Sequence, residues 1–228
     1  MSASSPAPWT LIGRGHIFLF RSSPALDQQD GGISEAHPRQ LDHFNTVMLV
    51  DYTASDVGPY RELLFIPGRF GFPEGAYRSI TRIYVSTTTS RSAGERNWGI
   101  PKRHAHFDWQ RDGREEQVTV TTPEGARVAT LGLRTARFLH IPVRTTLAPR
   151  RLSTLLHPWQ GRCLSVSLSA HGWVHWCRLT SASTDPALFP DLSQRTLLGG
   201  VTASRFEMLF PAAVAHPAVQ LQEIAGRS

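Results

Sequence analysis

The basic side chains of this chain are almost all arginine. Of the 24 Lys and Arg residues, 23 are arginine and one is a lysine, Lys102. Lysine is ordinarily among the commonest residues, so arginine has been accepted wherever a positive charge was enough. Arginine cannot lose its proton near neutral pH and cannot act as an amine nucleophile. Lys102 is therefore the first candidate for a catalytic group, the alternative being that it persists by chance.

The lysine lies in a segment rich in glycine, proline and tryptophan. Residues Gly94–Arg103 read Gly-Glu-Arg-Asn-Trp-Gly-Ile-Pro-Lys-Arg. The two glycines and the proline predict a tight, irregular backbone, and Trp98 and Ile100 would supply apolar walls around Lys102. Burial lowers the pKa of an amine, whereas an unburied lysine is neutral in only about one molecule in 2,500 at pH 7. The segment therefore favours a lysine that acts as an amine nucleophile.

The same segment, preceded by an expected strand at Ile80–Val85, resembles the acetoacetate decarboxylase superfamily. In that family a Pro-Lys pair follows a glycine-rich charged stretch, and the lysine forms a Schiff base with a β-oxo acid. The resemblance extends in the same order over three more stretches, which are Pro8-Trp9 with Arg14, Gly58-Pro59-Tyr60-Arg61-Glu62, and Arg127-Val128-Ala129-Thr130.

The resemblance implies a role for each matched residue. Lys102 would form the Schiff base, Glu62 would be the active-site carboxylate, and Arg14 would hold the substrate carboxylate, which arginine binds through two hydrogen bonds. Each has a structural alternative: a surface cation for Lys102, an outward strand position for Glu62, and a surface ion pair for Arg14. Tyr60, Trp98 and Arg103 are further candidates for contacts with the substrate. Core packing would also explain the two aromatic residues.

Two departures from the family concern the expected charges of the site. A second lysine that follows the first in well-studied decarboxylases is replaced by Arg103. The second acidic residue is also missing, because Val50 occupies its place and Asp51 is one step off. Adjacent strand residues point to opposite faces, so Asp51 would need a bulge to reach the site.

These departures leave the reaction open beyond the imine. The first expectation is a lyase that decarboxylates a small β-oxo acid through an imine on Lys102. One alternative is an aldolase, dehydratase or cyclase that uses the same imine on a larger oxo substrate. Another is a non-catalytic protein that binds a small molecule. The lysine supplies the electrophilic activation itself, so we expect no metal and no organic cofactor.

Several histidines and a cysteine also invite a chemical interpretation. His171, His175 and Cys177 could suggest zinc, but no second pair of ligands follows at a usual spacing. His104 and His106 could line the mouth of the pocket, although the wet face of an alternating strand explains them better. No nucleotide-binding or Ser-His-Asp motif is present.

The elements around these residues are mostly strands. We expect a mostly β (α+β) fold, a curled antiparallel β-barrel or cone that encloses a pocket, with a few small peripheral helices. Residues 1–228 would form one domain, with a loop or lid at 22–46 and a connection between two sheet layers at 142–161. A hairpin turn is expected at Pro123-Glu124-Gly125, a turn at His171-Gly172, and helices at Arg150–Leu156 and Ala218–Ile224. The expected strands are His16–Arg21, Val47–Tyr52, Arg61–Ile66, Ile80–Val85, Val118–Thr121, Val128–Leu133, Leu164–Leu168, Trp173–Leu179 and Ser204–Phe210.

Composition narrows the class of partner. The net charge is +6 and the pI is about 10.1, but the arginines are scattered, so we expect no nucleic-acid binding. No apolar run of about 18 residues predicts a membrane span, and the N-terminus does not read as a secretory signal. Two cysteines are too few for a disulfide framework. We therefore expect a cytoplasmic protein that binds a small oxo acid or ketone and, by the resemblance, a homo-oligomer.

Overall fold

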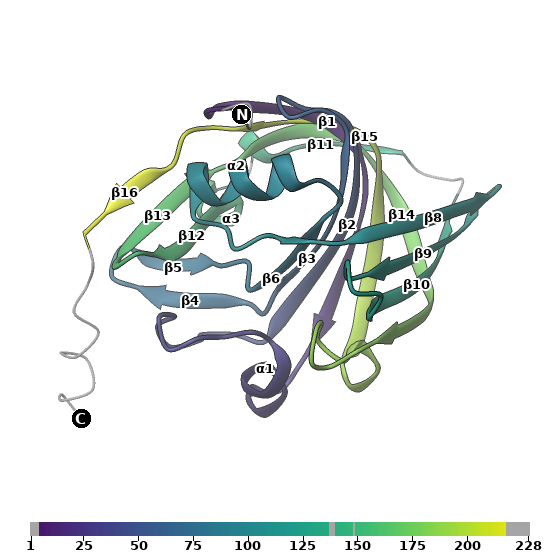
Figure 1. Ribbon diagram of the computed structural model, residues 1–228, viewed down its shortest axis with the longest axis horizontal. Coiled ribbons are helices and arrows are strands. Elements are labelled where there is room, and N and C mark those ends of the chain that lie inside the picture. The colour runs from purple at the N-terminus through teal and green to yellow at the C-terminus, as the bar shows by residue number, and fades with distance from the viewer. Residues whose placement is uncertain (1–4, 137–139, 148, 218–228) are drawn as a thin grey trace.

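Strands dominate the computed structural model, which describes residues 5–136, 140–147 and 149–217 (Figure 1). The larger of its two sheets consists of β1 (Trp9–Arg21), β2 (Phe44–Ala54), β3 (Tyr60–Ile66), β6 (Arg82–Val85), β7 (Arg103–His104), β8 (His106–Asp112), β9 (Glu115–Thr121), β10 (Arg127–Thr135), β11 (Ile141–Arg144), β14 (Ser169–Thr184) and β15 (Thr196–Phe210). Its strand order is β7-β6-β3-β2-β1-β15-β14-β10-β9-β8, and β11 pairs with β14.

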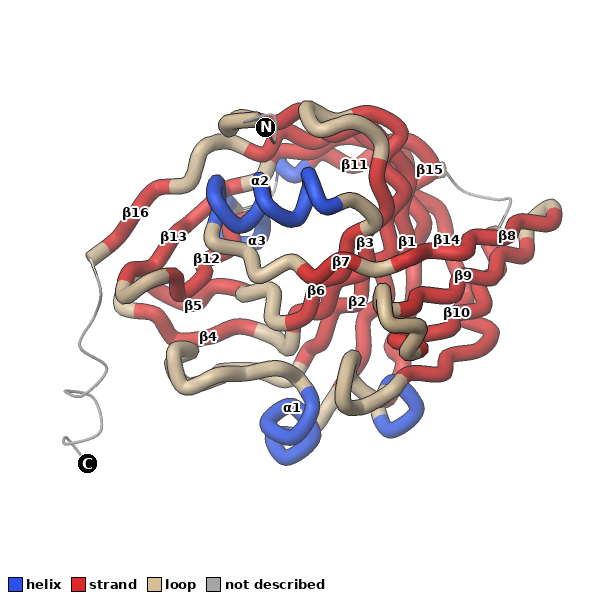
Figure 2. Tube along the Cα trace, in the orientation of Figure 1, coloured by secondary structure: helices blue, strands red, loops and turns tan. Residues whose placement is uncertain are grey.

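The chain itself joins the two ends of this strand order. Only Ala105 separates β7 at one end from β8 at the other. The guanidinium of Arg61 on β3 also donates to the carbonyl oxygen of Phe107 on β8, at 2.9 Å. The sheet therefore curls into a nearly closed barrel, as the tubes of Figure 2 show, and the expected curled, mostly β fold is confirmed.

A smaller sheet and three short α-helices complete the architecture. The smaller sheet has the order β16-β13-β12-β5-β4. Helix α2 packs against β6 and β7 of the larger sheet and β13 of the smaller one, which places it between the two sheets. The bounds of these elements are α1 (Pro24–Asp30), α2 (Thr88–Trp98), α3 (Arg150–Ser153), β4 (Arg69–Phe72), β5 (Gly75–Arg78), β12 (Thr154–Trp159), β13 (Arg162–Ser167) and β16 (Val214–His216), with 3-10 turns η1 (Thr145–Leu147) and η2 (Leu192–Gln194).

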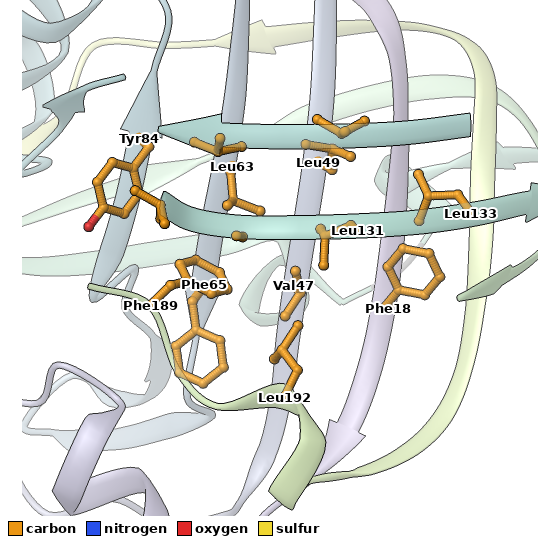
Figure 3. Packing of buried hydrophobic residues seen from close by; sticks show 14 of the residues in the cluster. Phe18, Val47, Leu49, Leu63, Phe65, Tyr84, Leu131, Leu133, Phe189 and Leu192 are labelled. Atoms are coloured by element: carbon orange, nitrogen blue, oxygen red, sulfur yellow. The ribbon is translucent and has the colours of Figure 1, made fainter. Parts of the chain in front are cut away.

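Strands β2 and β3 are buried on both faces over most of their length. On β2, Val47 and Leu49 pack against β9 and β10 inside the barrel, whereas Val50 and Tyr52 belong to a second core that faces the smaller sheet. Burial on both sides explains the continuous apolar runs of these strands, because neither face has to carry polar residues. Figure 3 shows the barrel core, where side chains from β1, β2 and β3 meet those of β10.

Every expected strand overlaps an observed one, and the Pro123–Gly125 hairpin turn lies between β9 and β10. The expected turn at His171-Gly172 is wrong, because β14 runs through both residues. A Cβ on Gly172 would be 2.5 Å from the carbonyl oxygen of Arg205, so this glycine permits close packing of strands. The expected helix at Arg150–Leu156 is only the four-residue α3, and that at Ala218–Ile224 lies outside the described residues. Residues 142–161 do connect the two sheets, from β11 to β12.

The expected loop or lid at 22–46 is a loop over residues 31–43, and the whole segment is anchored to the barrel. It contains α1 and the start of β2. Arg195 is buried beneath it, where its guanidinium donates to Asp30 at 3.0 Å and to Asn45 at 2.9 Å. Asp27 of α1 accepts from the amide nitrogen of Asn45 at 3.0 Å. These buried contacts attach the segment to the barrel. Breaking one of them would cost free energy, because a buried charge would lose its partner.

No helix in the described ranges is long and apolar enough to cross a membrane. The cytoplasmic location and the homo-oligomer remain predictions.

Candidate active site

A helix that the sequence analysis did not expect leads directly to the lysine. Helix α2 begins after Thr87, whose hydroxyl accepts from the backbone nitrogen of Ser90, as a helix N-cap does. It ends at Gly99, which adopts the left-handed conformation with φ 65°. The expected irregular backbone therefore begins only at Gly99, and Gly94 is helical.

From the last residue of the helix onward, alternate residues face a cavity between the two sheets. Trp98, Ile100 and Lys102 line it, while Gly99 and Pro101 point to the other side of the segment. The Trp98 ring packs edge-on against Trp9, with ring centres 4.7 Å apart. Its indole nitrogen donates to the carbonyl oxygen of Pro211 at 2.7 Å. Trp98 is thus both core packing and cavity wall.

Lys102 forms a buried ion pair with Glu62. The two side chains are 5% and 6% exposed, and the lysine Nζ lies 2.9 Å from Glu62 Oε2. Regular alternation along β3 places Tyr60, Glu62 and Leu64 together on the cavity face. Desolvation makes such a pair costly unless its geometry is good. The chain therefore holds an amine and a carboxylate in contact inside an apolar cavity.

Two tyrosines and a serine complete the surroundings of this ion pair. Tyr52 donates to Glu62 Oε1 at 3.2 Å, and Lys102 Nζ donates to Ser90 Oγ at 3.4 Å. The Nζ atom also lies 5.2 Å from the centre of the Tyr60 ring, where a cation is attracted by the π electrons. Burial, and then the negative charge of Glu62, raise the pKa of Tyr52 and Tyr60 well above 10. Both phenols therefore keep their protons and can act as hydrogen-bond donors.

Gly94 on α2 makes room for the lysine. A Cβ at this position would lie 2.7 Å from Lys102 Cε and 2.8 Å from Cδ. Such distances are too short for carbon atoms, so a larger residue would displace the lysine side chain. The glycine of the Gly-Glu-Arg motif is therefore explained by the space that the amine needs.

We predict that Gly94→Ala will separate stability from reactivity. Alanine in a helix interior is favoured over glycine by about 1 kcal/mol, and the flexible lysine stem can move aside, so the free energy of unfolding should change little. The displaced Nζ should form an imine with an oxo acid at least about tenfold more slowly, because small misplacements of a reacting group are costly. Chemical denaturation and the rate of reductive trapping measure the two effects. Unchanged trapping at unchanged stability would contradict this role for Gly94.

The cavity has a volume of about 410 Å³ and a mostly apolar lining. Of the described residues that line it, Glu62 is the one carboxylate, and Lys102 and Arg78 supply the cationic side chains. Arg78, on β5, donates to the carbonyl oxygen of Leu152 at 3.4 Å. From the segment expected to be a lid, only Thr46 contributes to the lining, so residues 22–46 do not cover this cavity.

Arg14 does not line the cavity, so the expectation that it holds the substrate carboxylate is not supported. Its guanidinium lies 2.6 Å from Glu116 of β9, and His16 and Trp109 also contact that carboxylate. Burial raises the pKa of Glu116, but the hydrogen bonds and charges of His16 and Arg14 outweigh it and hold the pKa at about 2. Arg14 is thus committed to a buried ion pair on the opposite face of β1.

Asp51 and Arg103 also lie away from the cavity. Regular alternation along β2 turns Val50 and Tyr52 into the cavity and Asp51 to the opposite face, where its carboxylate is 3.4 Å from Arg61. Asp51 therefore does not replace the missing second acid. Arg103 is exposed and lines a separate, smaller cavity, which removes it from the expected contacts with the substrate.

The remaining candidates do not form a metal site. Within the described ranges, no cluster of His, Cys, Asp and Glu side chains could hold a metal ion. His171 lines the large cavity, whereas His175 and Cys177 do not. His104 and His106 lie outside the cavity, and His106 is exposed, which agrees with the preferred interpretation of a wet strand face.

Three polar residues of the site were missed by the sequence analysis. Tyr52 could have been found, because strict alternation from Val50 places it on the same face as Glu62. Ser90 and Arg78 gave no signal, since each depends on how distant elements pack. The smaller sheet brings Arg78 to the cavity, and helix α2 brings Ser90 to the lysine.

Comparison with known proteins shows which solved structures have a similar fold. No protein-family model matches the chain, and neither does any curated protein sequence. Among solved structures, acetoacetate decarboxylase from Legionella pneumophila subsp. pneumophila str. Philadelphia 1 is similar with a TM-score of 0.67 and 12% identity, over 92% of this chain and 87% of that one. An acetoacetate decarboxylase-like enzyme from Sphingomonas wittichii RW1 gives 0.67 and 14%, over 93% and 94%. The enduracididine biosynthesis enzyme MppR, complexed with pyruvate, gives 0.63 and 12%, over 92% and 90%. The chain thus has the acetoacetate decarboxylase-like fold.

Proposed function

We propose that this protein is a Schiff-base-forming lyase that acts on an oxo acid through an imine on Lys102. The observation that carries the proposal is the buried contact of the Lys102 amine with Glu62, the one carboxylate among the described cavity residues. The acetoacetate decarboxylase-like fold supports the proposal. The resemblance of the sequence to that family also assigns the Schiff base to Lys102.

The reaction requires a proton to leave the lysine first. Glu62 Oε2 is within hydrogen-bond distance of Nζ and can accept that proton, so that the neutral amine attacks the carbonyl carbon. The resulting carbinolamine loses water, with the proton returned from Glu62, and becomes a protonated imine. The protonated phenol of Tyr60 would donate a hydrogen bond to the carbonyl oxygen during this step, while the hydroxyl of Tyr52 keeps its bond to Glu62.

Decarboxylation then breaks the bond between the α-carbon and the carboxylate. Carbon dioxide leaves, and the electron pair of the broken bond moves through the imine to give an enamine on Lys102. Glu62, ionised again after the loss of water, takes up a proton from solvent and passes it to the enamine, which becomes a protonated imine. Water then releases the ketone and the protonated amine of Lys102. An apolar wall assists the step, because the carboxylate loses its charge as the bond breaks.

Arg78 takes the place in this proposal that the sequence analysis gave to Arg14. It is the arginine among the described cavity residues, and a guanidinium binds a carboxylate through two parallel hydrogen bonds. It would therefore hold an acidic group of the substrate while Lys102 reacts with the carbonyl.

A second candidate reaction is aldol, dehydration or cyclisation chemistry from the same imine. The cavity of about 410 Å³ falls within the range of sites for ligands of drug size, which favours a larger substrate. MppR has also been solved in complex with the condensation product of pyruvate and imidazole 4-carboxaldehyde, which supports this candidate.

Reductive trapping tests the proposal. The protein is incubated with acetoacetate, pyruvate and larger oxo acids, reduced with borohydride and weighed intact. A Schiff-base enzyme should gain the mass of one reduced adduct per chain, and release of carbon dioxide separates decarboxylation from the second candidate. A non-catalytic binding protein should show saturable binding without an adduct, and that result would overturn the proposal.

A further inference from the structure

A second cavity lies behind the segment that carries the catalytic lysine. It has a volume of about 250 Å³, and Gly99 and Pro101 form one wall of it. The neighbours of these two residues in the chain, Trp98, Ile100 and Lys102, face the large cavity instead. The two cavities thus share the Gly99–Lys102 segment as a wall, but the small cavity presents a different set of polar groups.

A chain of hydrogen bonds determines which nitrogen of His157 carries a proton. The backbone nitrogen of Ser34 donates to His37 Nδ1 at 3.2 Å, so the neutral His37 ring has its proton on Nε2. That nitrogen donates to Ser79 Oγ at 3.2 Å, and the Ser79 hydroxyl donates to His157 Nδ1 at 3.1 Å. His157 therefore has its proton on Nε2.

The proton on His157 Nε2 has no acceptor in the described part of the chain. The residue is only 2% exposed and lines the small cavity, and its Nε2 atom has no hydrogen-bond partner there. Burial, and then the nearby His37, lower the pKa of His157 to about 3, so the ring is neutral at physiological pH. A buried donor without an acceptor costs free energy unless a ligand satisfies it.

Two arginines line the same cavity. Arg82 Nε is buried and has no hydrogen-bond partner in the described ranges, and none of the ion pairs found there includes Arg82 or Arg103. Burial, and then the positive charge of Arg103, lower the pKa of Arg82. The Arg82 guanidinium packs over Gly32, where a Cβ would collide with it. Two like charges are therefore held near one another, and the carboxylate that acts on Arg82 from nearby, Asp30, is itself paired with Arg195.

From this set of groups we infer that the small cavity is a binding site for a phosphate-type dianion. The groups of His157, Arg82 and Arg103 that remain available are all donors, so the ligand must offer acceptor oxygens. Two uncompensated guanidinium groups match two negative charges, and arginine is well suited to phosphate geometry. A monocarboxylate would leave one positive charge unmatched. The inference does not depend on the reaction at Lys102.

Titration of the full chain with inorganic phosphate tests the site. The measurement is calorimetry at constant ionic strength and at a pH where phosphate is a dianion, with acetate as the monocarboxylate probe. Wild type should bind phosphate and bind acetate far more weakly. Arg82→Gln and Arg103→Gln should each weaken phosphate binding by about tenfold or more, because each removes a charged hydrogen-bond donor. Phosphate should also shift the nitrogen resonance of His157 Nε2.

Two control variants remove the same charge elsewhere. Arg134→Gln alters an exposed ion pair with Glu115, and Arg69→Gln alters one with Asp42; both should keep the wild-type affinity for phosphate. Should all four variants lose affinity equally, binding would reflect diffuse positive charge, and the proposed site would be wrong. Absence of phosphate binding by wild type, or equal binding of acetate, would overturn it as well. Arg103 is exposed, so its variant still gives an answer if Arg82→Gln fails to fold.

Discussion

Lys102→Arg is expected to abolish both the borohydride-trapped adduct and turnover. Arginine keeps the positive charge beside Glu62 but cannot supply a neutral amine, so no carbon–nitrogen bond to the substrate can form. The sequence makes the result unusually clear, because Lys102 is its one lysine and the amino terminus is the only other amine of the chain. Intact mass after reduction, followed by peptide mapping, measures the loss.

A second variant tests whether the position of the amine matters or only its presence. In Lys102→Arg combined with Arg103→Lys, the amine moves by one residue to a side chain that faces away from the large cavity. The adduct should remain absent, and thermal unfolding should show that both variants fold. An adduct of wild-type yield in either variant would place the imine elsewhere and end the proposal for Lys102.

The sequence was sufficient to single out both residues of the buried ion pair. Lys102 stood out by its uniqueness, and Glu62 by the resemblance of its segment to a family. Their contact could not be predicted from spacing, because 40 residues separate them and only the pairing of β3 with β6 and β6 with β7 brings them together. Tyr60 came from the same resemblance, because it lies in the Gly58–Glu62 segment.

The prediction for Arg14 failed for a physical reason. Arg14 was placed by its distance along the chain from matched residues, whereas the face of a strand changes with every residue. The same alternation turns Asp51 away from the site, as the sequence analysis expected in the absence of a bulge. Both lie on the barrel side of β1 and β2 and are paired with Glu116 and Arg61. A charged residue on a strand buried on both faces needs a partner on one side, and the sequence does not show on which side that partner lies.

Helix α2 was missed because its buried face is made of small residues. The buried positions Ser90, Ala93, Gly94 and Trp98 follow helical spacing, but only the last is large and apolar. This composition serves the site, since Ser90 contacts the amine and Gly94 leaves room for the lysine stem. A helix is usually recognised by large apolar residues at helical spacing. In α2 small residues occupy most of these positions, and they leave space for the Lys102 side chain.

Glu62→Gln is expected to lower turnover by about 10²–10⁴-fold, the range found for loss of a general acid or base. Glutamine has nearly the same shape, and its one acceptor oxygen can still accept from Lys102 while its amide nitrogen donates to the Tyr52 hydroxyl. It cannot, however, take a proton from the amine or pass one to the enamine. Trapping over long times should still label Lys102, because imine formation can proceed with water as the base. Steady-state kinetics together with the time course of trapping measure the two steps separately.

The split between slow turnover and retained labelling is what identifies proton transfer as the role of Glu62. If the carboxylate only held the lysine in place, labelling and turnover would fall together. Glu115→Gln is the matched control, since it removes an exposed carboxylate that pairs with Arg134 and should leave both rates unchanged. Tyr52→Phe removes one hydrogen bond to Glu62 and keeps its charge, so its effect should be nearer tenfold, about what one such bond contributes. Wild-type turnover in Glu62→Gln would remove this residue from the mechanism and leave the protons to solvent.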